Sequence, residues 1–230
     1  MRTLGLIGGM SWESTATYYR LLNEGAKRRL GGLHSAPLLL WSFDFAGIAA
    51  AQTAGDWEGL TVAMVAAARR LEAGGAEAIV ICANTMHRMA DEVARSVKVP
   101  LIHVVDATAA AVKATASRRP ALLATRYTME QEFYRGRLAG RHAIEAPVPD
   151  EAGRETLQRI IYEELCRGIV RPGSKAACLG QISALRRQGA DGVILGCTEL
   201  GMILSQSDLD CPVFDTTVIH AAAALDFACG

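Results

Sequence analysis

Two short segments of the chain end in small, hydroxyl or thiol side chains that could hold and act on a carboxylate. Residues 75–85 align without a gap on residues 189–199, and each copy reads as a turn, an apolar strand and a polar tip. In this alignment Cys197 corresponds to Ala83 and not to Cys82. The repeat therefore predicts a thiol at the tip of one copy and a methyl group at the tip of the other.

Cys197 has the residue type and the expected position of an acid–base group. A thiol at a helix N-terminus lies at the positive end of the helix dipole, which lowers its pKa from about 8.5 and favours the thiolate. A thiolate serves as a nucleophile or as a base toward carbon. A cysteine after a strand is by itself more often a core residue, and it is the duplication that favours a functional role. Thr198, which corresponds to Asn84, could hold the other side of the same carboxylate.

The first copy offers neutral donors for an anion. The side chains of Asn84 and Thr85, with the free N–H groups of a following helix, make a cradle suited to a carboxylate. His87 is a candidate base, although a histidine one turn into a helix is more often a surface or core residue. Strand side chains alternate between faces, so if Ala83 points into the site, Cys82 points away from it into the core.

A glycine turn and one glutamine add further candidates. Gly8 and Gly9 follow the first expected strand, and Ser11 or Ser14 could cap the next helix so that its N–H groups face an anion. A plain tight turn with a capping serine explains the same residues. The segment does not match the dinucleotide-binding or phosphate-loop patterns. Gln52 either hydrogen-bonds a substrate or occupies a solvated helix position.

Alternating strands and helices must position these residues. Strands are expected at 4–8, 37–43, 78–82, 101–105, 121–125, 192–196 and 213–214. Helices are expected at 14–30, 57–73, 86–97, 107–116, 130–138, 154–168, 175–187 and 217–227. Strands that alternate with helices predict βαβ units and mainly parallel sheets, hence an α/β fold.

The repeat extends beyond the two tips and predicts the domain organisation. Residues 5–9 match residues 121–125, so the second copy begins near the middle of the chain. We expect two pseudo-symmetric Rossmann-like lobes, each with a mainly parallel sheet flanked by helices. The first lobe would contain residues 1–105 and the C-terminal helix, residues 213–230, and the second would contain residues 106–212.

Composition points to a protein of the cytoplasm that acts on a small molecule. The 230 residues carry a formal net charge of zero with scattered basic residues, which argues against nucleic acid or an anionic membrane as a partner. No apolar run approaches the roughly 20 residues that a membrane helix needs. The first residues are too few and too rich in glycine for a signal peptide. The six cysteines have no CxxC pair and no metal-ligand spacing, so we expect free thiols and no bound metal.

Five motifs lie along the chain: GLIGGMSWES at 5–14, NTMH at 84–87, TRYTME at 125–130, GCTE at 196–199 and PVFDT at 212–216. Together they resemble the aspartate/glutamate racemase family, the cofactor-independent amino-acid racemases. The chain is similar to this family over essentially its whole length. It most resembles the bacterial L-aspartate/glutamate-specific racemases, which share the motifs MSWES and NTMH.

The resemblance implies a fold and a mechanism. It implies two α/β lobes with the active site in the cleft between them, a homodimer, and no cofactor. One group would remove the Cα proton of a dicarboxylic amino acid while a group on the opposite face returns a proton. Cys197 would be one of these groups, and Asn84, Thr85 and Thr198 would hold the α-carboxylate. Cys166 stands where some aspartate racemases carry a lysine for the distal carboxylate. The residues implied to bind substrate are Met10, Gln52, Ala83, Asn84, Thr85, Cys166, Thr198 and Glu199.

Ala83 departs from the pattern of the family at the first catalytic position, which is Cys in most members and Thr in the closest relatives. Alanine cannot transfer a proton. Three interpretations remain: racemisation in which water or a neighbour such as Cys82 replaces the missing group, a one-base reaction, or binding without turnover. A single thiol also resembles the arylmalonate decarboxylases, which protonate an enediolate after loss of CO2. We retain an aspartate/glutamate-type racemase or epimerase, with the decarboxylase and an amino-acid-binding homologue or sensor as alternatives.

Overall fold

The computed structural model describes all 230 residues, which divide into two compact units. Unit 1 contains Met1–His103 and His220–Gly230, and unit 2 contains Val104–Ile219. Each unit has its own parallel sheet, and each is described by itself below.

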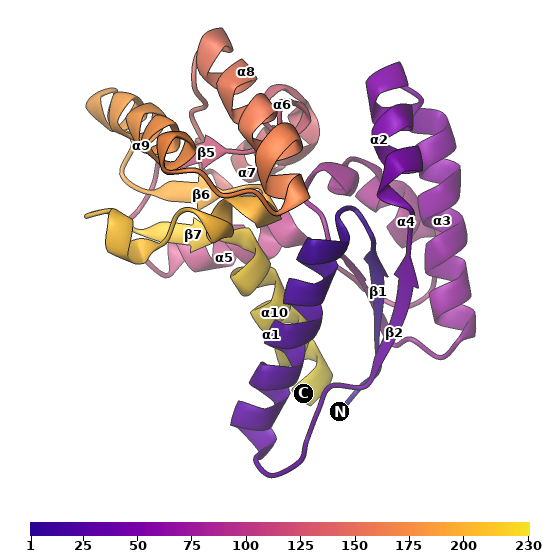
Figure 1. The fold of residues 1–230 in the computed structure, drawn as a ribbon. Helices are drawn as coiled ribbons and strands as arrows, with labels where there is room; N and C mark the ends of the chain where they lie inside the picture. Colours follow the sequence, from indigo (N-terminus) through magenta and orange to yellow (C-terminus); the bar gives the residue numbers. More distant parts are fainter. The chain divides into compact units, whose positions relative to one another are not determined.

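Unit 1 is built on a four-stranded parallel sheet in the order β2-β1-β3-β4, of which β1 and β2 are labelled in Figure 1. Its strands are β1 (Leu4–Gly8), β2 (Leu38–Ser42), β3 (Ala78–Ile81) and β4 (Leu101–Ile102). Its helices are α1 (Trp12–Leu30), α2 (Phe45–Ala54), α3 (Trp57–Ala73), the 3-10 helix η1 (Thr85–Met89) and α4 (Ala90–Ser96). The helix α10 (Thr216–Cys229) begins in unit 2 and ends in unit 1.

Alternating side chains of β1 and β3 fill both faces of this sheet. On one face Leu6 and Val80 belong to an apolar cluster with α1 and α10. On the other face Ile7 and Ile81 belong to a cluster with α3 and α4. Strands buried on both faces explain the continuous apolar runs in the sequence. Each fully buried aliphatic side chain contributes about 1.5–3 kcal/mol to folding.

Unit 2 has a three-stranded parallel sheet in the order β5-β6-β7 (Figure 1). Its strands are β5 (Ala121–Leu123), β6 (Val193–Leu195) and β7 (Val213–Asp215). Its α-helices are α5 (Val104–Lys113), α6 (Arg126–Glu130), α7 (Glu132–His142), α8 (Glu151–Arg159) and α9 (Pro172–Arg187). Shorter turns are the π-helical η2 (Ile160–Glu164) and the 3-10 helices η3 (Leu165–Arg167), η4 (Thr198–Met202) and η5 (Gln206–Asp208).

The boundary between the units differs from the sequence expectation at the C-terminal end. Residues 213–219 were expected in the first lobe, but they belong to unit 2. The reason is that β7 pairs with β6, with Val213 opposite Val193. The first boundary lies at His103, close to the expected residue 105.

Equivalent backbone hydrogen bonds confirm the repeat seen in the sequence. The bonds in unit 1 run from Glu77 N to Thr3 O (2.8 Å), from Ile79 N to Pro100 O (2.9 Å) and from Cys82 N to Ile7 O (2.9 Å). The bonds in unit 2 run from Asp191 N to Arg119 O (3.2 Å), from Val193 N to Pro212 O (2.9 Å) and from Gly196 N to Leu123 O (2.7 Å). The donors of the two sets are aligned pairs of the repeat. Ala83 and Cys197 therefore follow equivalent strands at equivalent positions.

The helix α2 was not expected from the sequence. Its residues are mostly small, so they show little of the apolar periodicity that indicates a helix. The residues that cap this helix were the one indication of it in the sequence. The side chain of Asp44 accepts a hydrogen bond from Ala46 N at 3.1 Å, and Gly55 ends the helix in the left-handed conformation.

The helix expected at 154–168 is interrupted. It begins as α8, passes through the π-helical η2 and ends in η3 before Gly168. Glu164, at the end of η2, is buried and accepts hydrogen bonds from Ser174 Oγ (2.5 Å) and Arg159 Nη1 (3.0 Å). A buried carboxylate needs such partners, and the altered helical pitch brings Glu164 to them.

Gly9 links β1 to α1 in a conformation that a side chain would not tolerate. Its φ is +78°, and a Cβ atom there would overlap the backbone of Phe43. We expect Gly9→Ala to lower the free energy of unfolding by about 1–3 kcal/mol. Gly47 in α2 has open space at its Cβ position, so Gly47→Ala should be neutral or stabilise by up to about 1 kcal/mol. Urea denaturation measures both changes, and a Gly9→Ala variant as stable as the parent would contradict this account.

Candidate functional site

The side chains of Cys82 and Ala83 lie on opposite faces of the sheet at the end of β3. Ala83 belongs to the apolar cluster that contains Met10 and Met86. Cys82 belongs to the other cluster, with Tyr18. Burial raises the pKa of the Cys82 thiol well above its usual value. Cys82 is therefore a neutral core residue on the face opposite to Ala83.

Further candidates of unit 1 gather around the tip at Ala83. Asn84 and Thr85 are buried where η1 begins. Gln52 on α2 is only 4% exposed, and its Nε2 donates to Sδ of Met86 at 3.4 Å. The alternative of a solvated helix position for Gln52 is therefore wrong. Gln52 is a buried polar residue that contacts the segment directly after the tip.

Three buried histidines pack together next to Ala83. His87 Nδ1 donates to the carbonyl oxygen of Ala83 at 2.8 Å. The His87 ring centroid lies 4.7 Å from that of His103 and 5.5 Å from that of His220. His87 thus uses Nδ1 to hold the backbone of the tip, as expected of a core histidine with a satisfied ring nitrogen.

The glycine turn after β1 is closed by its own side chains. Ser11 is the capping residue of α1, and its Oγ accepts from Ser14 N at 3.4 Å. Thr15 Oγ1 accepts from Gly9 N at 2.8 Å and donates to Ser11 O at 2.9 Å. These contacts favour the plain turn with an N-cap over an anion site.

Cys197 lies beside a carboxylate at the end of β6. Its Sγ donates to Oε2 of Glu199 at 2.9 Å, and Thr198 Oγ1 donates to the same oxygen at 2.7 Å. Cys197 and Glu199 are 7% and 4% exposed. A hydroxyl carries one proton, and in this arrangement Thr198 Oγ1 donates it in the hydrogen bond to Glu199.

The expectation of a lowered pKa for Cys197 is wrong. Burial raises the pKa of the Cys197 thiol well above its usual value, and the charges of Glu199 and Cys166 raise it further. The segment that follows is the 3-10 helix η4 of five residues, so the thiol does not stand at the N-terminus of an α-helix. Cys197 is therefore protonated at neutral pH, and in this form the thiol can donate a proton.

Cys166 and one residue that the sequence analysis missed lie near this thiol. Cys166, in η3, is partly exposed and packs against the cluster that contains Cys197. Tyr162, in the π-helical turn before it, has a pKa raised by burial and then by Tyr127, Cys197 and Cys166. Tyr162 also packs against the apolar cluster that contains Cys197. Its place one helical turn before Cys166 was the one sequence signal that could have identified it.

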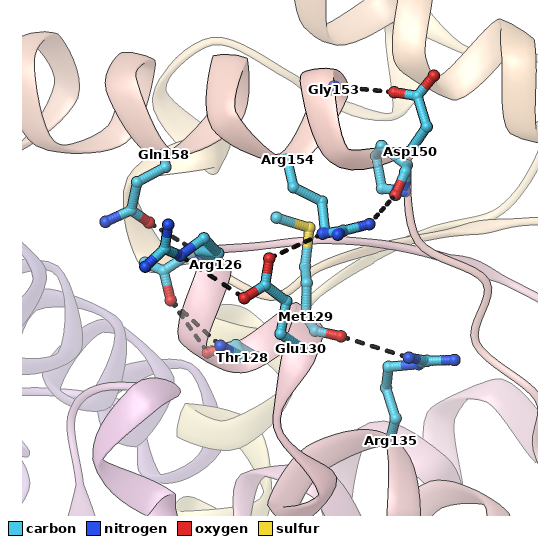
Figure 2. Close-up of polar contacts among 11 residues, drawn as sticks. Arg126, Thr128, Met129, Glu130, Arg135, Asp150, Gly153, Arg154 and Gln158 are labelled. Atoms are coloured by element: carbon cyan, nitrogen blue, oxygen red, sulfur yellow. Dashed lines mark hydrogen bonds and ion pairs between the residues drawn. The ribbon is translucent and has the colours of Figure 1, made fainter. Parts of the chain in front are cut away.

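The TRYTME motif after β5 ties α6 to α8 (Figure 2). Thr125 caps α6, and Arg126 N donates to Oε1 of Gln158 at 2.8 Å. Glu130 accepts from Arg154 Nε at 2.9 Å and lies 3.6 Å from Arg126 Nε. Exposed ion pairs of this kind contribute about 0–1 kcal/mol each. The charged residues of this motif thus have a structural explanation.

No group of three or more His, Cys, Asp or Glu side chains is arranged to hold a metal ion. All six cysteines are free. The chain has no helix with both the length and the apolar character needed to cross a membrane.

The sequence pattern of the Asp/Glu/Hydantoin racemase family matches residues 7–224 of this chain. The chain belongs to this family. The resemblance drawn from the five motifs is thereby confirmed, and so is the prediction of an α/β fold with parallel sheets flanked by helices.

Known structures and proteins of this racemase family are similar over most of their length. The crystal structure of a proposed Asp/Glu racemase from Yersinia pestis is 50% identical, with a TM-score of 0.93 and full coverage of both chains. That of an aspartate racemase homologue from Pyrococcus horikoshii OT3 is 35% identical, with a TM-score of 0.87 and full coverage of both chains. The broad-specificity amino-acid racemase RacX of Bacillus subtilis is 22% identical over 74% of this chain and 73% of RacX.

The buried His220 should make the racemase fold less stable in mild acid. Its Nε2 donates to Ile102 O at 2.7 Å, its Nδ1 accepts from the Tyr18 hydroxyl at 2.8 Å, and burial lowers its pKa to about 4. An unfolded histidine has a pKa of about 6.5, so between these values the unfolded chain binds a proton that the folded chain excludes. The free energy of unfolding should be fully present above about pH 6.5 and fall by up to about 3 kcal/mol toward about pH 4.

Urea denaturation at several pH values tests this assignment. His220→Gln should be less stable at neutral pH because it loses packing, but its stability should change less between about pH 6.5 and pH 4. His34 is exposed, so His34→Gln should keep the pH dependence of the parent. A His220→Gln variant with the full dependence of the parent would assign the effect to other groups.

Proposed function

We propose that this chain is a cofactor-independent racemase or epimerase of dicarboxylic amino acids such as aspartate and glutamate. The observation that carries the proposal is the buried Cys197 thiol, hydrogen-bonded to Glu199 directly after the central strand β6. The carboxyl ends of parallel strands are where α/β proteins bind small ligands. A thiol in an apolar setting with a carboxylate partner has the equipment to exchange a proton with carbon.

The proposed mechanism requires both tips to reach one substrate. Asn84 and Thr85 in unit 1 and the backbone at Thr198 in unit 2 would hold the α-carboxylate. Removal of the Cα proton leaves an enediolate-like charge, and fixed neutral donors stabilise that charge without an electron-accepting cofactor. The pocket would be completed by Met10, Gln52 and Cys166.

The two faces of the substrate Cα would meet different groups of the protein. Cys197 supplies a proton carrier on one face, whereas Ala83 supplies none on the other. Cys82 lies on the opposite side of β3, in the core, so we assign the Ala83 face to water. Exchange of the Cα proton on the Cys197 face would then be faster than inversion of the carbon.

Cys197→Ala should abolish exchange of the Cα proton. Positioned acid–base groups contribute about 10²- to 10⁴-fold, so exchange of L- and D-aspartate and glutamate in D2O should fall by at least about 100-fold. Calorimetry should find dicarboxylate binding largely retained. The matched control is Cys211→Ala, which removes another buried thiol of unit 2 and should keep the exchange rate of the parent. Exchange within about threefold of the parent in Cys197→Ala, under 1 kcal/mol in the barrier, would remove this thiol from the mechanism.

Ala83→Thr should raise the rate of racemisation, because it restores a proton carrier on the second face. The gain should be at least about 100-fold, measured by polarimetry or by chiral chromatography of aspartate and glutamate. Ala83→Val is the matched control, since valine has the shape of threonine without the hydroxyl. A parent that already racemises fast, and that Cys82→Ser cripples, would instead identify Cys82 as the second group.

The single thiol also favours a second candidate, a decarboxylase that protonates an enediolate after loss of CO2. Release of CO2 from substituted malonates, with no exchange of amino-acid protons, would support it. Binding of an amino acid in a thermal-shift titration, without either reaction, would support a sensor.

A cytoplasmic homodimer completes the proposal. All six cysteines are free thiols, and a reducing compartment such as the cytoplasm keeps thiols in this form. Light scattering after size exclusion would measure the oligomeric state.

A further inference from the structure

We propose that Glu199 is a positioning residue that holds a proton for Cys197, so that thiol and carboxylate work as one acid–base pair. The effect on rate rests on the proposed function. The coupling of the two groups does not, because it can be measured on the protein without any substrate.

The geometry of the pair is specific. Cys197 Sγ lies 2.9 Å from Glu199 Oε2, and Thr198 Oγ1 lies 2.7 Å from the same oxygen. Two donors therefore converge on one carboxylate oxygen, which holds the Glu199 side chain against the thiol. Both partners of the pair are almost fully buried, so water competes little for either hydrogen bond.

The surroundings of Cys197 keep its thiol protonated in the resting state. Burial and the neighbouring Glu199 carboxylate both raise the pKa of the Cys197 thiol. Cys166 from η3 also raises the pKa of this thiol, and Tyr162 from η2 packs against the apolar cluster that contains it. The resting state is therefore a neutral thiol hydrogen-bonded to a carboxylate, and not a free thiolate.

This resting state has a simple proton balance. In the forward step the Sγ proton moves to Oε2 of Glu199, which leaves a thiolate and a neutral carboxyl group. The thiolate takes the Cα proton, and the electron pair of the C–H bond moves into the substrate carboxylate as an enediolate. In the return step the thiol gives a proton back to Cα, and the Glu199 proton returns to sulfur. No oxidant, reductant or metal enters the balance.

The pair explains how a desolvated thiol becomes basic enough to act. Burial makes the thiolate of Cys197 a stronger base than an ordinary one, because apolar surroundings disfavour the negative charge. Glu199 accepts the proton that must leave the thiol first, and it is then neutral. Replacing Glu199 by glutamine should therefore give more thiolate at a given pH, because the negative charge beside the thiol is lost, but it removes the group that takes the proton from sulfur.

Alkylation of Cys197 by iodoacetamide tests the coupling directly. The thiolate reacts, and the extent at Cys197 is read by mass spectrometry of the peptide that contains it. At fixed neutral pH, Glu199→Gln should speed the alkylation of Cys197 by about tenfold or more, since each unit of pKa changes the thiolate fraction tenfold. The reaction in the parent should reach its midpoint at a higher pH than that of a free cysteine peptide.

Glu164→Gln is the matched control. Glu164 is also a buried carboxylate of unit 2, but it acts on the Cys178 thiol, whose pKa is raised to about 11 mainly by burial. This variant should leave the alkylation of Cys197 within about twofold of the parent. Equal rates for Cys197 in Glu199→Gln and the parent would overturn the proposal. A Cys197 midpoint in the parent at or below that of the free peptide would also overturn it, even if every Glu199 variant failed to fold.

The consequence for catalysis is measured separately. Glu199→Gln should slow deuterium exchange at Cα of aspartate and glutamate by about 10- to 100-fold with little change in substrate binding. Glu199→Asp keeps the charge and should recover part of that loss. If the alkylation shift is present but the parent exchanges no amino-acid proton, the thiol–carboxylate pair stands and the proposed racemase function fails.

Discussion

The parallel pairing of one central strand with its neighbour, β3 with β1 and β6 with β5, determines where the two tips leave their sheets. In each unit the last bond of the ladder comes from the residue directly before the tip: Cys82 N donates to Ile7 O, and Gly196 N donates to Leu123 O. The next residue must then leave the sheet at its carboxyl edge. The type of that residue is free to differ between the copies, because the backbone makes the ladder.

Burial at the end of β6 has two effects on the chemistry of Cys197. It disfavours the thiolate, and it also strengthens the hydrogen bond from the thiol to Glu199 because little water competes there. A thiol on an exposed loop would have the opposite properties, with an easily formed but weakly basic anion. The apolar surroundings and the Glu199 carboxylate therefore act together on the acidity of the Cys197 thiol.

The sequence was sufficient to predict the repeat, the α/β class and most strands, because buried parallel strands appear as apolar runs bounded by glycine and proline. It was insufficient where an element lacks such a pattern. The helix α2 consists mainly of small residues, and the break after α8 depends on the long-range contact between Glu164 and Ser174. The pKa of Cys197 was predicted in the wrong direction, because a rule for helix N-termini was applied where a 3-10 turn forms and where burial dominates. Tyr162 was missed because its one sequence signal, the spacing of one helical turn to Cys166, does not by itself show that it packs against the cluster that contains Cys197.

The bond from His87 to the carbonyl oxygen of Ala83 has a consequence for how this protein could evolve. The histidine holds the main chain of the tip, so the backbone keeps its course whatever side chain occupies position 83. A replacement at that position changes the reactive groups of the site while it leaves this anchor in place. Alanine and threonine codons differ in their first base alone, so lineages could exchange an inert and a proton-carrying residue there in a single mutational step. The scaffold can thus gain or lose a reaction without first rebuilding its framework.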